Sequence, residues 1–314
     1  MNHTALSYLV FGIVLLLAVV FDLGLLSKKS KSITIKQAFY QTSFWIGLAV
    51  AFFIFLLYEE SQKTAFEYIS AYLMEWSLSI DNIFVFILIF SFFKIHKEYY
   101  GRVLLLGILG AIIFRVIFIT IGIALVTSFS WILYIFGAFL VYTGFKMFFV
   151  EEHEEFDPGK NKVYIFLQKI LPITNQEAGG KFTKRINGKK HFTLLFVVVV
   201  LLATTDIVFA LDSIPAVFAI STNKMVIYTS NIFAVLGLRS LFFLLRGAVS
   251  KFDYLQQGIA IVLIFIGVKM LIEYFDIHLP IYISLAVIVC CLVGSILFSV
   301  YNKKIEIPSK EKEV

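Results

Sequence analysis

Nine apolar runs of about 20 residues constrain the fold of this chain more than any other feature. A run of that length crosses the roughly 30 Å hydrocarbon core of a bilayer as an α-helix. Only 15% of the 314 residues are charged, against about a quarter in a soluble domain. The sequence therefore predicts an all-α, polytopic transmembrane bundle that forms a single membrane domain, residues 1–314. The predicted spans are 5–26, 37–58, 66–93, 102–127, 130–149, 192–220, 226–246, 254–275 and 280–300.

The distribution of basic residues predicts the orientation of these spans. Of the 27 lysines and arginines, 22 fall in segments on one side of the membrane when the spans are counted in order. Cytoplasmic loops carry such an excess, so this side is the predicted inside. The N-terminus is then outside, and the loop 150–191 and the tail 301–314 are cytoplasmic. The net charge of +6 thus reflects topology rather than a nucleic-acid partner.

Two groups of three spans resemble each other. The third span reads EWSLSIDNIFVF, with Glu75 and Asp81 six residues apart. The sixth reads DIVFALDSIPAVF, with Asp206 and Asp212 also six apart. In both, the second acid is followed by a small polar residue and an isoleucine.

Further matches follow in the same order along the chain. The fourth and seventh spans carry Arg115 and Arg239, and the fifth and eighth end in TGFKMF and IGVKML. Because the third span starts outside and the sixth starts inside, residues 66–149 and 192–275 are predicted to be inverted repeats. Such repeats are a recurring architecture of secondary transporters, with the substrate site near the midplane at the repeat interface.

The acids inside the spans indicate a functional site. A carboxylate at the centre of a span costs about 3 kcal/mol on insertion scales, so such acids usually face a polar interior. Arg115, Arg239 and Lys269 are expected to pair with acids or carbonyl groups. The two arginines cannot neutralise all four matched acids, which leaves negative charge for a cation or for protons. Glu67, near the outer surface, is expected to be simply solvated.

The spacing of the acids leaves two arrangements open. Six residues on a straight helix place two carboxylates about 120° apart, so one ion cannot be held by both. Either each pair serves two steps of a path, or the helix is broken between the acids. Pro215 favours a break, because it clashes with the carbonyl of Leu211 and removes its hydrogen bond.

A break beside Asp212 would expose a carbonyl oxygen next to Ser213, with Asn82 supplied by the other repeat. Such an all-oxygen set suits hard divalent ions, namely Mg²⁺, Ca²⁺ and Mn²⁺. The segments EWSLSIDNIFVF, TTDIVFALDSIPAVFAIS and NIFAVLGLRSLFF also resemble the signature segments of the TerC/Alx family of bacterial membrane proteins. The resemblance runs from about Phe21 to Phe275.

That family is associated with manganese export and metal homeostasis, and its name comes from tellurium resistance. The resemblance implies a bacterial inner-membrane protein whose partners are the lipid bilayer and Mn²⁺, the latter as substrate and not as a prosthetic group. It places the metal site on the acidic motif positions and on a DLG element in the first helix. These residues are Glu75, Asp81, Asn82, Asp206, Asp212, Ser213 and Asp22.

The resulting prediction is a proton- or gradient-coupled Mn²⁺ exporter, not an enzyme. Asp81 and Asp212 are the expected ion site, with Glu75 and Asp206 as gates, proton-coupling groups or additional ligands. One alternative is an accessory or redox-modulating membrane protein without transport, although the adjacent Cys290-Cys291 pair gives it little support. An intramembrane aspartyl protease is disfavoured, because neither Asp206 nor Asp212 follows a Gly-x-Gly sequence.

The loop 150–191 is the only sizeable soluble segment. Its VYIFLQKILPI stretch predicts a short amphipathic helix on the inner surface. The remainder has mixed charge and is expected to be mostly mobile, with EEHEEFDPGK as a solvated run rather than a metal site.

Overall fold

The computed structural model describes residues 3–27, 33–149, 159, 161–174, 178–246, 254–275, 277 and 279–310. In this part of the chain nine helices have 18 or more residues, and each coincides with a predicted span. They are α1 (His3–Ser27), α2 (Ile35–Glu59), α3 (Gln62–Phe92), α4 (Tyr100–Ser128), α5 (Ile132–Phe149), α7 (Leu194–Ile220), α8 (Lys224–Leu245), α9 (Leu255–Ile272) and α10 (Ile281–Lys310).

Seven of these helices, α2, α3, α4, α5, α8, α9 and α10, are long and apolar enough to cross a membrane within the described residues. The other two, α1 and α7, contain the shorter apolar stretches Leu6–Leu17 and Leu194–Ile207. The all-α membrane fold is therefore confirmed, while the count of nine spans stays a prediction.

Polar residues mark where several helices begin. Thr34 accepts a hydrogen bond from the Gln37 N–H, and the Gln37 side chain accepts one from the Thr34 N–H, which forms a capping box before α2. Asn223 accepts from the Met225 N–H at the start of α8. These side chains satisfy backbone donors that have no partner inside the helix, and they allow the short connections between antiparallel neighbours.

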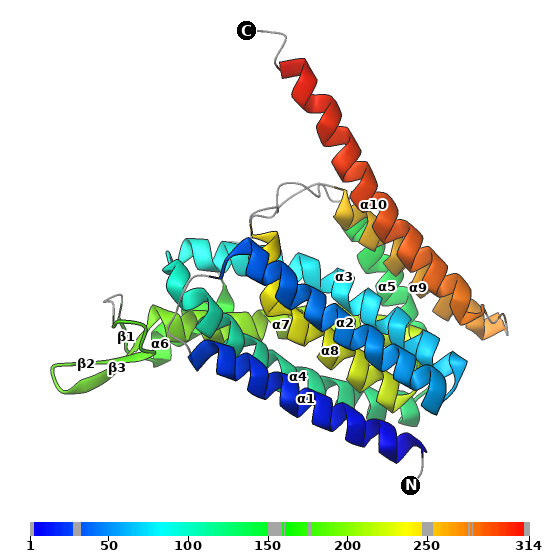
Figure 1. Ribbon diagram of the computed structural model, residues 1–314, viewed down its shortest axis with the longest axis horizontal. Helices are drawn as coiled ribbons and strands as arrows, with labels where there is room; N and C mark the ends of the chain where they lie inside the picture. The colour runs from blue at the N-terminus through cyan, green and yellow to red at the C-terminus, as the bar shows by residue number, and fades with distance from the viewer. Residues whose placement is uncertain are drawn as a thin grey trace.

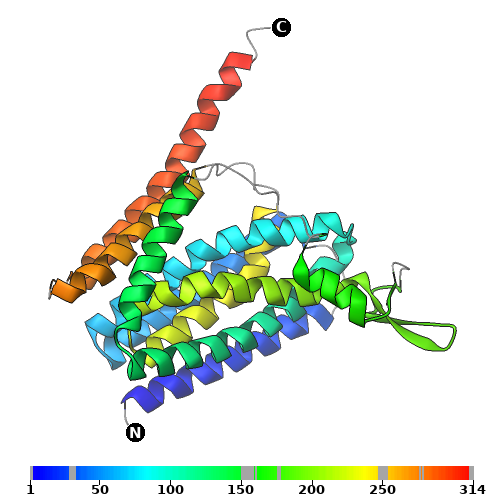
Figure 2. The same cartoon turned by 180° about the vertical axis from the view of Figure 1, so that it is seen from behind.

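The helices are arranged around α8 (Figure 1). Its apolar stretch is 94% buried, against 17% for that of α10. It packs against α2, α3 and α4, while α7 packs against α3 and α4. Helix α5 lies against α9, and α10 covers α9 and part of α3, as seen from behind in Figure 2. Helix α1 lies at the edge, along α2 and α8.

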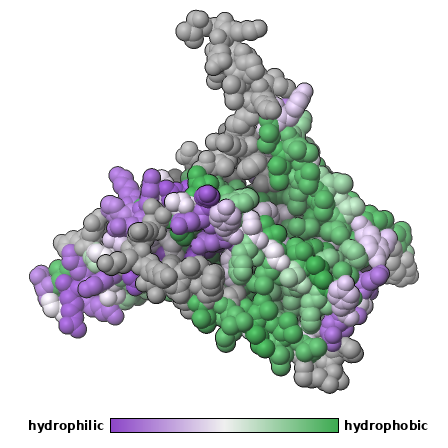
Figure 3. Space-filling view, in the orientation of Figure 1, coloured by the Kyte–Doolittle hydropathy of each residue, from purple (hydrophilic) through white to green (hydrophobic). Residues whose placement is uncertain are grey.

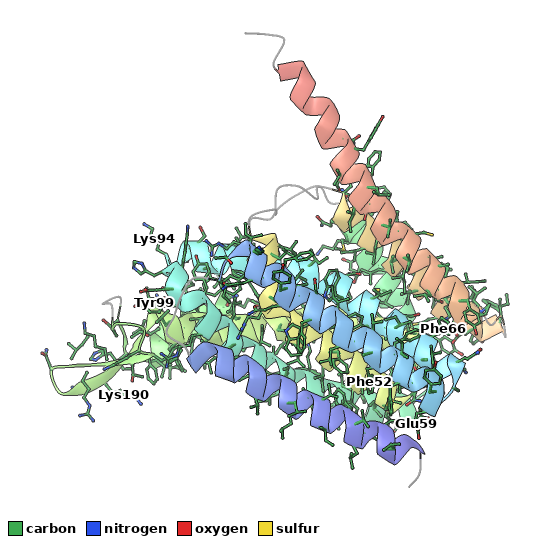
Figure 4. All side chains as sticks on the ribbon, in the orientation of Figure 1. Phe52, Glu59, Phe66, Lys94, Tyr99 and Lys190 are labelled. Atoms are coloured by element: carbon green, nitrogen blue, oxygen red, sulfur yellow. The ribbon has the colours of Figure 1, made fainter. Side chains whose placement is uncertain are left out.

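The surface is apolar around the middle of the bundle and hydrophilic at two opposite ends (Figure 3). Glu59 and Phe66 lie at one end, and Lys94, Tyr99 and Lys190 lie at the other (Figure 4). This division agrees with the predicted spans, because a belt of exposed apolar side chains is what a hydrocarbon core requires.

The loop between α5 and α7 contains more structure than the sequence indicated. The predicted amphipathic helix is present as α6 (Lys162–Ile170). Three short strands that were not predicted, β1 (Ile173–Thr174), β2 (Thr183–Ile186) and β3 (Lys189–Thr193), form a sheet in the order β1-β3-β2. The mobility of the loop stays a prediction. β1 is parallel to β3, and β2 is antiparallel to it. The segment 151–158, which includes the acidic run, lies outside the described residues.

Two local features explain this sheet. Asn187 and Gly188 have φ values of 49° and 78°, the backbone that a two-residue hairpin turn requires. The module also contacts the start of α4, since the Arg102 guanidinium donates to the Gly180 carbonyl at 3.2 Å and lies 4.8 Å from the Phe182 ring. It is therefore docked against the bundle, and β3 leads directly into α7.

The break expected in the sixth span is absent. Helix α7 continues from Leu194 to Ile220 with Pro215 inside it. A proline removes one backbone hydrogen bond, but the flanking turns are buried against α3 and α4. Packing of these turns holds the helix together across the proline.

Candidate functional site

Four helices meet at the side chain of Arg115, which is 2% exposed. Its Nε and Nη2 donate to the Asp206 Oδ2 and Oδ1 atoms at 2.8 and 3.0 Å, a bidentate pair between α4 and α7. Its Nη1 donates to Glu75 Oε1 on α3 and to Asn231 Oδ1 on α8, the latter at 3.1 Å. The structure therefore brings together Glu75 and Asp206, one acid from each predicted repeat.

The charges of this cluster do not balance. One guanidinium faces two carboxylates, and all three groups are almost completely buried. Glu75 Oε2 is buried and has no hydrogen-bond partner among the described residues. A buried, unpaired carboxylate oxygen is costly, so the cluster can take up one more positive charge, either a proton or a metal ion.

Further buried oxygen atoms continue from the cluster along two helices. On α3, Ser79 and Asn82 lie four and seven residues after Glu75. On α7, Ser213 lies seven residues after Asp206. These spacings keep the residues on one side of each helix. All three are at most 2% exposed, and no described residue makes a hydrogen bond to the Ser79 or Ser213 hydroxyl oxygen. The two faces offer only oxygen ligands.

A second contact fixes how α3 and α7 are aligned. The Ser221 hydroxyl, just after α7, donates to Glu67 Oε2 near the start of α3 at 2.5 Å. The two helices therefore run antiparallel. The expectation that Glu67 is simply solvated is wrong, because its side chain is 12% exposed and holds this hydrogen bond.

The helical rise then places the four acids of the motif at two levels. Measured from the Glu67–Ser221 contact at about 1.5 Å per residue, the backbones of Glu75 and Asp212 lie about 12 and 13 Å deep. Those of Asp81 and Asp206 lie about 21 and 22 Å deep. Each level has one acid from α3 and one from α7.

Three of the predicted site residues lie partly outside the structural description. The backbones of Asp22, Asp81 and Asp212 belong to α1, α3 and α7, but their side chains are not among the described ones. Their roles remain predictions. Among described residues, no three His, Cys, Asp or Glu side chains are grouped so that they could hold a metal ion.

The other expected pairings have mixed outcomes. Arg115 pairs with acids, as predicted, and Lys269 Nζ lies 3.5 Å from the Ala219 carbonyl oxygen. Arg239 is buried on α8. Asn231 was not among the predicted site residues, although an asparagine two turns before Arg239 in an apolar span is a visible signal of a polar interior. Its Nδ2 donates to the Ile227 carbonyl, which turns Oδ1 toward Arg115.

Comparison with known proteins agrees with this architecture. The chain is 43% identical over 298 residues to an uncharacterized membrane protein of Rickettsia felis, covering 95% of this chain and 98% of the relative. It is 41% identical to an uncharacterized membrane protein of Myxococcus xanthus, covering 90% and 88%. It is 38% identical, covering 93% of both chains, to an Escherichia coli K12 protein named "Putative membrane-bound redox modulator Alx". No solved structure matches. Residues 60–306 match the TerC family of integral membrane proteins, and the chain belongs to that family.

Proposed function

We propose that this protein is a secondary transporter that exports a hard divalent cation, with Mn²⁺ as substrate, from the bacterial cytoplasm. The observation that carries the proposal is the buried cluster in which Arg115 faces both Glu75 and Asp206. Its remaining negative charge, inside an apolar bundle, requires a mobile positive charge. A cluster that exchanges a metal ion for protons would couple cation export to proton entry.

The chemistry of the ligands supports a hard ion. Neither α3 nor α7 contains a histidine or a cysteine, the residues that zinc and copper sites use. Carboxylate, amide and hydroxyl oxygens are available instead, and these suit Mg²⁺, Ca²⁺ and Mn²⁺. The choice of manganese among them rests on the resemblance to the TerC family.

The two levels of acids favour a path with two steps. Because α7 is continuous, positions 206 and 212 lie about 120° apart around one helix axis. The helical rise also separates the backbones of Asp81 and Asp212 by about 8 Å along the bundle. We therefore assign Asp81 with Asp206 to an inner step and Asp212 with Glu75 to an outer step, in place of one ion shared by Asp81 and Asp212.

The close crossing of α5 and α9 supports the inverted repeats. A Cβ atom on Gly144 would lie 2.8 Å from the Ala260 carbonyl oxygen, and one on Gly137 would lie 3.0 Å from that of Gly267. When the two repeats are aligned on Lys146 and Lys269, Gly144 and Gly267 both lie two residues before the lysine. Gly137 and Ala260 both lie nine residues before it. Exchanging the two predicted repeats would exchange these two contacts, which supports the proposed inverted-repeat arrangement.

Transport by purified protein in liposomes tests the proposal. Asp81→Asn and Asp212→Asn keep the size of the side chain but remove its charge, so each variant should abolish Mn²⁺ transport while the protein stays inserted and abundant. Glu98→Gln is the matched control, because Glu98 is an exposed acid outside the bundle and its loss should leave transport unchanged. Normal transport by both aspartate variants would refute the ion path.

A redox modulator without transport is the alternative that the name of the Escherichia coli relative suggests. Cys290 and Cys291, the two cysteines of the chain, are free thiols on α10, a helix that contributes nothing to the Arg115 cluster. Two results together would favour this alternative. The purified protein would move no Mn²⁺ in liposomes, and deletion of its gene would still change the manganese content of the cell.

A further inference from the structure

A second polar network joins three helices at the end of the bundle where α3 begins. Glu67 of α3 accepts the 2.5 Å hydrogen bond from Ser221, which follows α7. The Ser221 hydroxyl also accepts from the Asn223 N–H at 3.0 Å, so its orientation is fixed. Lys269 of α9 lies 3.5 Å from the carbonyl oxygen of Ala219, in the last turn of α7. The network thus links the first predicted repeat, through α3, to the second, through α7 and α9.

Lys269 is held in this network by electrostatic forces. It is 6% exposed, which is rare for a lysine and costly unless opposite charge is near. The last turn of a helix exposes carbonyl oxygens without partners and carries partial negative charge, so an ammonium group is favoured there. Glu67 and Glu273 are both within electrostatic reach of Lys269. Lys269 thus ties α9 to the last turn of α7, while the exposed Lys63 pairs with Glu67 Oε1 at 3.9 Å.

This network lies directly in line with the Arg115 cluster. Glu67, Ala71 and Glu75 are spaced by four residues on α3, so they follow one side of the helix. Ala71 is fully buried between the two acids. An ion that leaves the outer level of acids along this side of α3 would pass Glu67.

The equivalent position in the other repeat is different. Lys146 on α5 matches Lys269 by sequence, yet it is exposed. The two equivalent lysines therefore have different environments, as they would have if only the outer end of the bundle were closed.

We propose that Glu67, Ser221 and Lys269 form a latch that holds the end of α7 to α3 and α9 and closes the outer end of the path, and that an exiting divalent cation opens it by replacing the Ser221 hydroxyl at the Glu67 carboxylate. This inference rests on the proposed transport function. A divalent ion binds a carboxylate more strongly than a neutral hydroxyl does, so it competes well for Glu67. Once the ion departs to the outside, the Ser221 hydroxyl returns to Glu67 and the latch closes.

Labelling of a buried cysteine tests the latch separately from transport. In a Cys290→Ser/Cys291→Ser background, Ala71→Cys is a reporter behind the latch, probed with a membrane-impermeant maleimide from the outside. Glu67→Gln replaces a charged acceptor of the Ser221 hydroxyl by a neutral one, and Lys269→Met removes the ammonium donor to Ala219, so each should raise the labelling rate about tenfold. Lys146→Met, the matched control, should leave the rate unchanged. Mn²⁺ added to the reporter with an intact latch should raise the rate, whereas the same ionic strength of Na⁺ should not.

The outcomes distinguish the two proposals. Unchanged labelling in Glu67→Gln and Lys269→Met would overturn the latch, even if Mn²⁺ transport is normal. If the Lys269→Met protein fails to insert into the membrane, the labelling rate in Glu67→Gln decides whether the latch exists, because this substitution keeps the size of the side chain. An increase seen only from the inner side would also overturn the latch. Absence of Mn²⁺ transport by the unmodified protein would instead overturn the proposed function, and the effect of the two variants on labelling would still decide whether this end is closed by the latch.

Discussion

At the scale of single residues, Arg115 determines how the acids of this bundle are tolerated. Its guanidinium is a rigid fork, and its two ends bind Asp206 and Glu75 from different helices. Lysine, with a single ammonium group, could not form the bidentate pair with Asp206. Asn231 adds a neutral acceptor, so the cluster gains a hydrogen bond without gaining charge.

Removal of the arginine is therefore expected to destabilise the protein. Arg115→Met would leave two carboxylates buried without a counter-ion, at a cost of about 3–5 kcal/mol. The triple variant Arg115→Met/Glu75→Gln/Asp206→Asn, which has no charge left in the cluster, should recover much of that loss. Thermal unfolding in detergent measures both effects. Equal unfolding temperatures for Arg115→Met and the unmodified protein would show that the ion pairs are not structural.

At the scale of helices, the pairing of α5 with α9 depends on glycines. The two backbones approach so closely that side chains cannot be added at the crossing, the same use of small residues that brings membrane helices together in general. Transport by rocking repeats needs elements that pivot without losing contact, and this crossing joins the last helices of the two predicted repeats.

Gly144→Ala is expected to loosen that pair. The added Cβ would lie 2.7 Å from the Ile264 side chain and 2.8 Å from the Ala260 carbonyl oxygen, so the helices must separate. We expect a loss of about 1–3 kcal/mol, typical of overpacking. Gly47→Ala on α2 is the control, because nothing lies within 4 Å of its added Cβ, and it should be neutral or slightly stabilising. Similar unfolding temperatures for the two variants would contradict this account.

At the scale of the whole molecule, the face seen in Figure 3 has an apolar middle between two hydrophilic ends. Lys94 and Lys190 of the basic hairpin lie at one end, and Glu59 lies at the other (Figure 4). This polarity agrees with the excess of basic residues in the predicted inner segments.

The orientation can be tested at two sites. An impermeant amine reagent should label Lys189 and Lys190, which are exposed on the hairpin, in inverted vesicles and not in right-side-out vesicles. A C-terminal reporter that is active only outside the membrane should stay silent, because the tail is predicted to be inside. Labelling from the outside or an active reporter would show that the span count is wrong.

The sequence by itself determined where the helices lie and which residues carry the chemistry. Long apolar runs and intramembrane acids are local signals, since hydrophobic length and the cost of a buried charge depend little on neighbours. Only the tertiary structure decided that Arg115 joins Glu75 to Asp206, that Asn231 completes the cluster, and that Glu67 is hydrogen-bonded to Ser221 rather than solvated. Such partners depend on the rotation and register of packed helices, which no single span encodes. Packing also keeps α7 continuous at Pro215, although the loss of one backbone hydrogen bond there had predicted a broken helix.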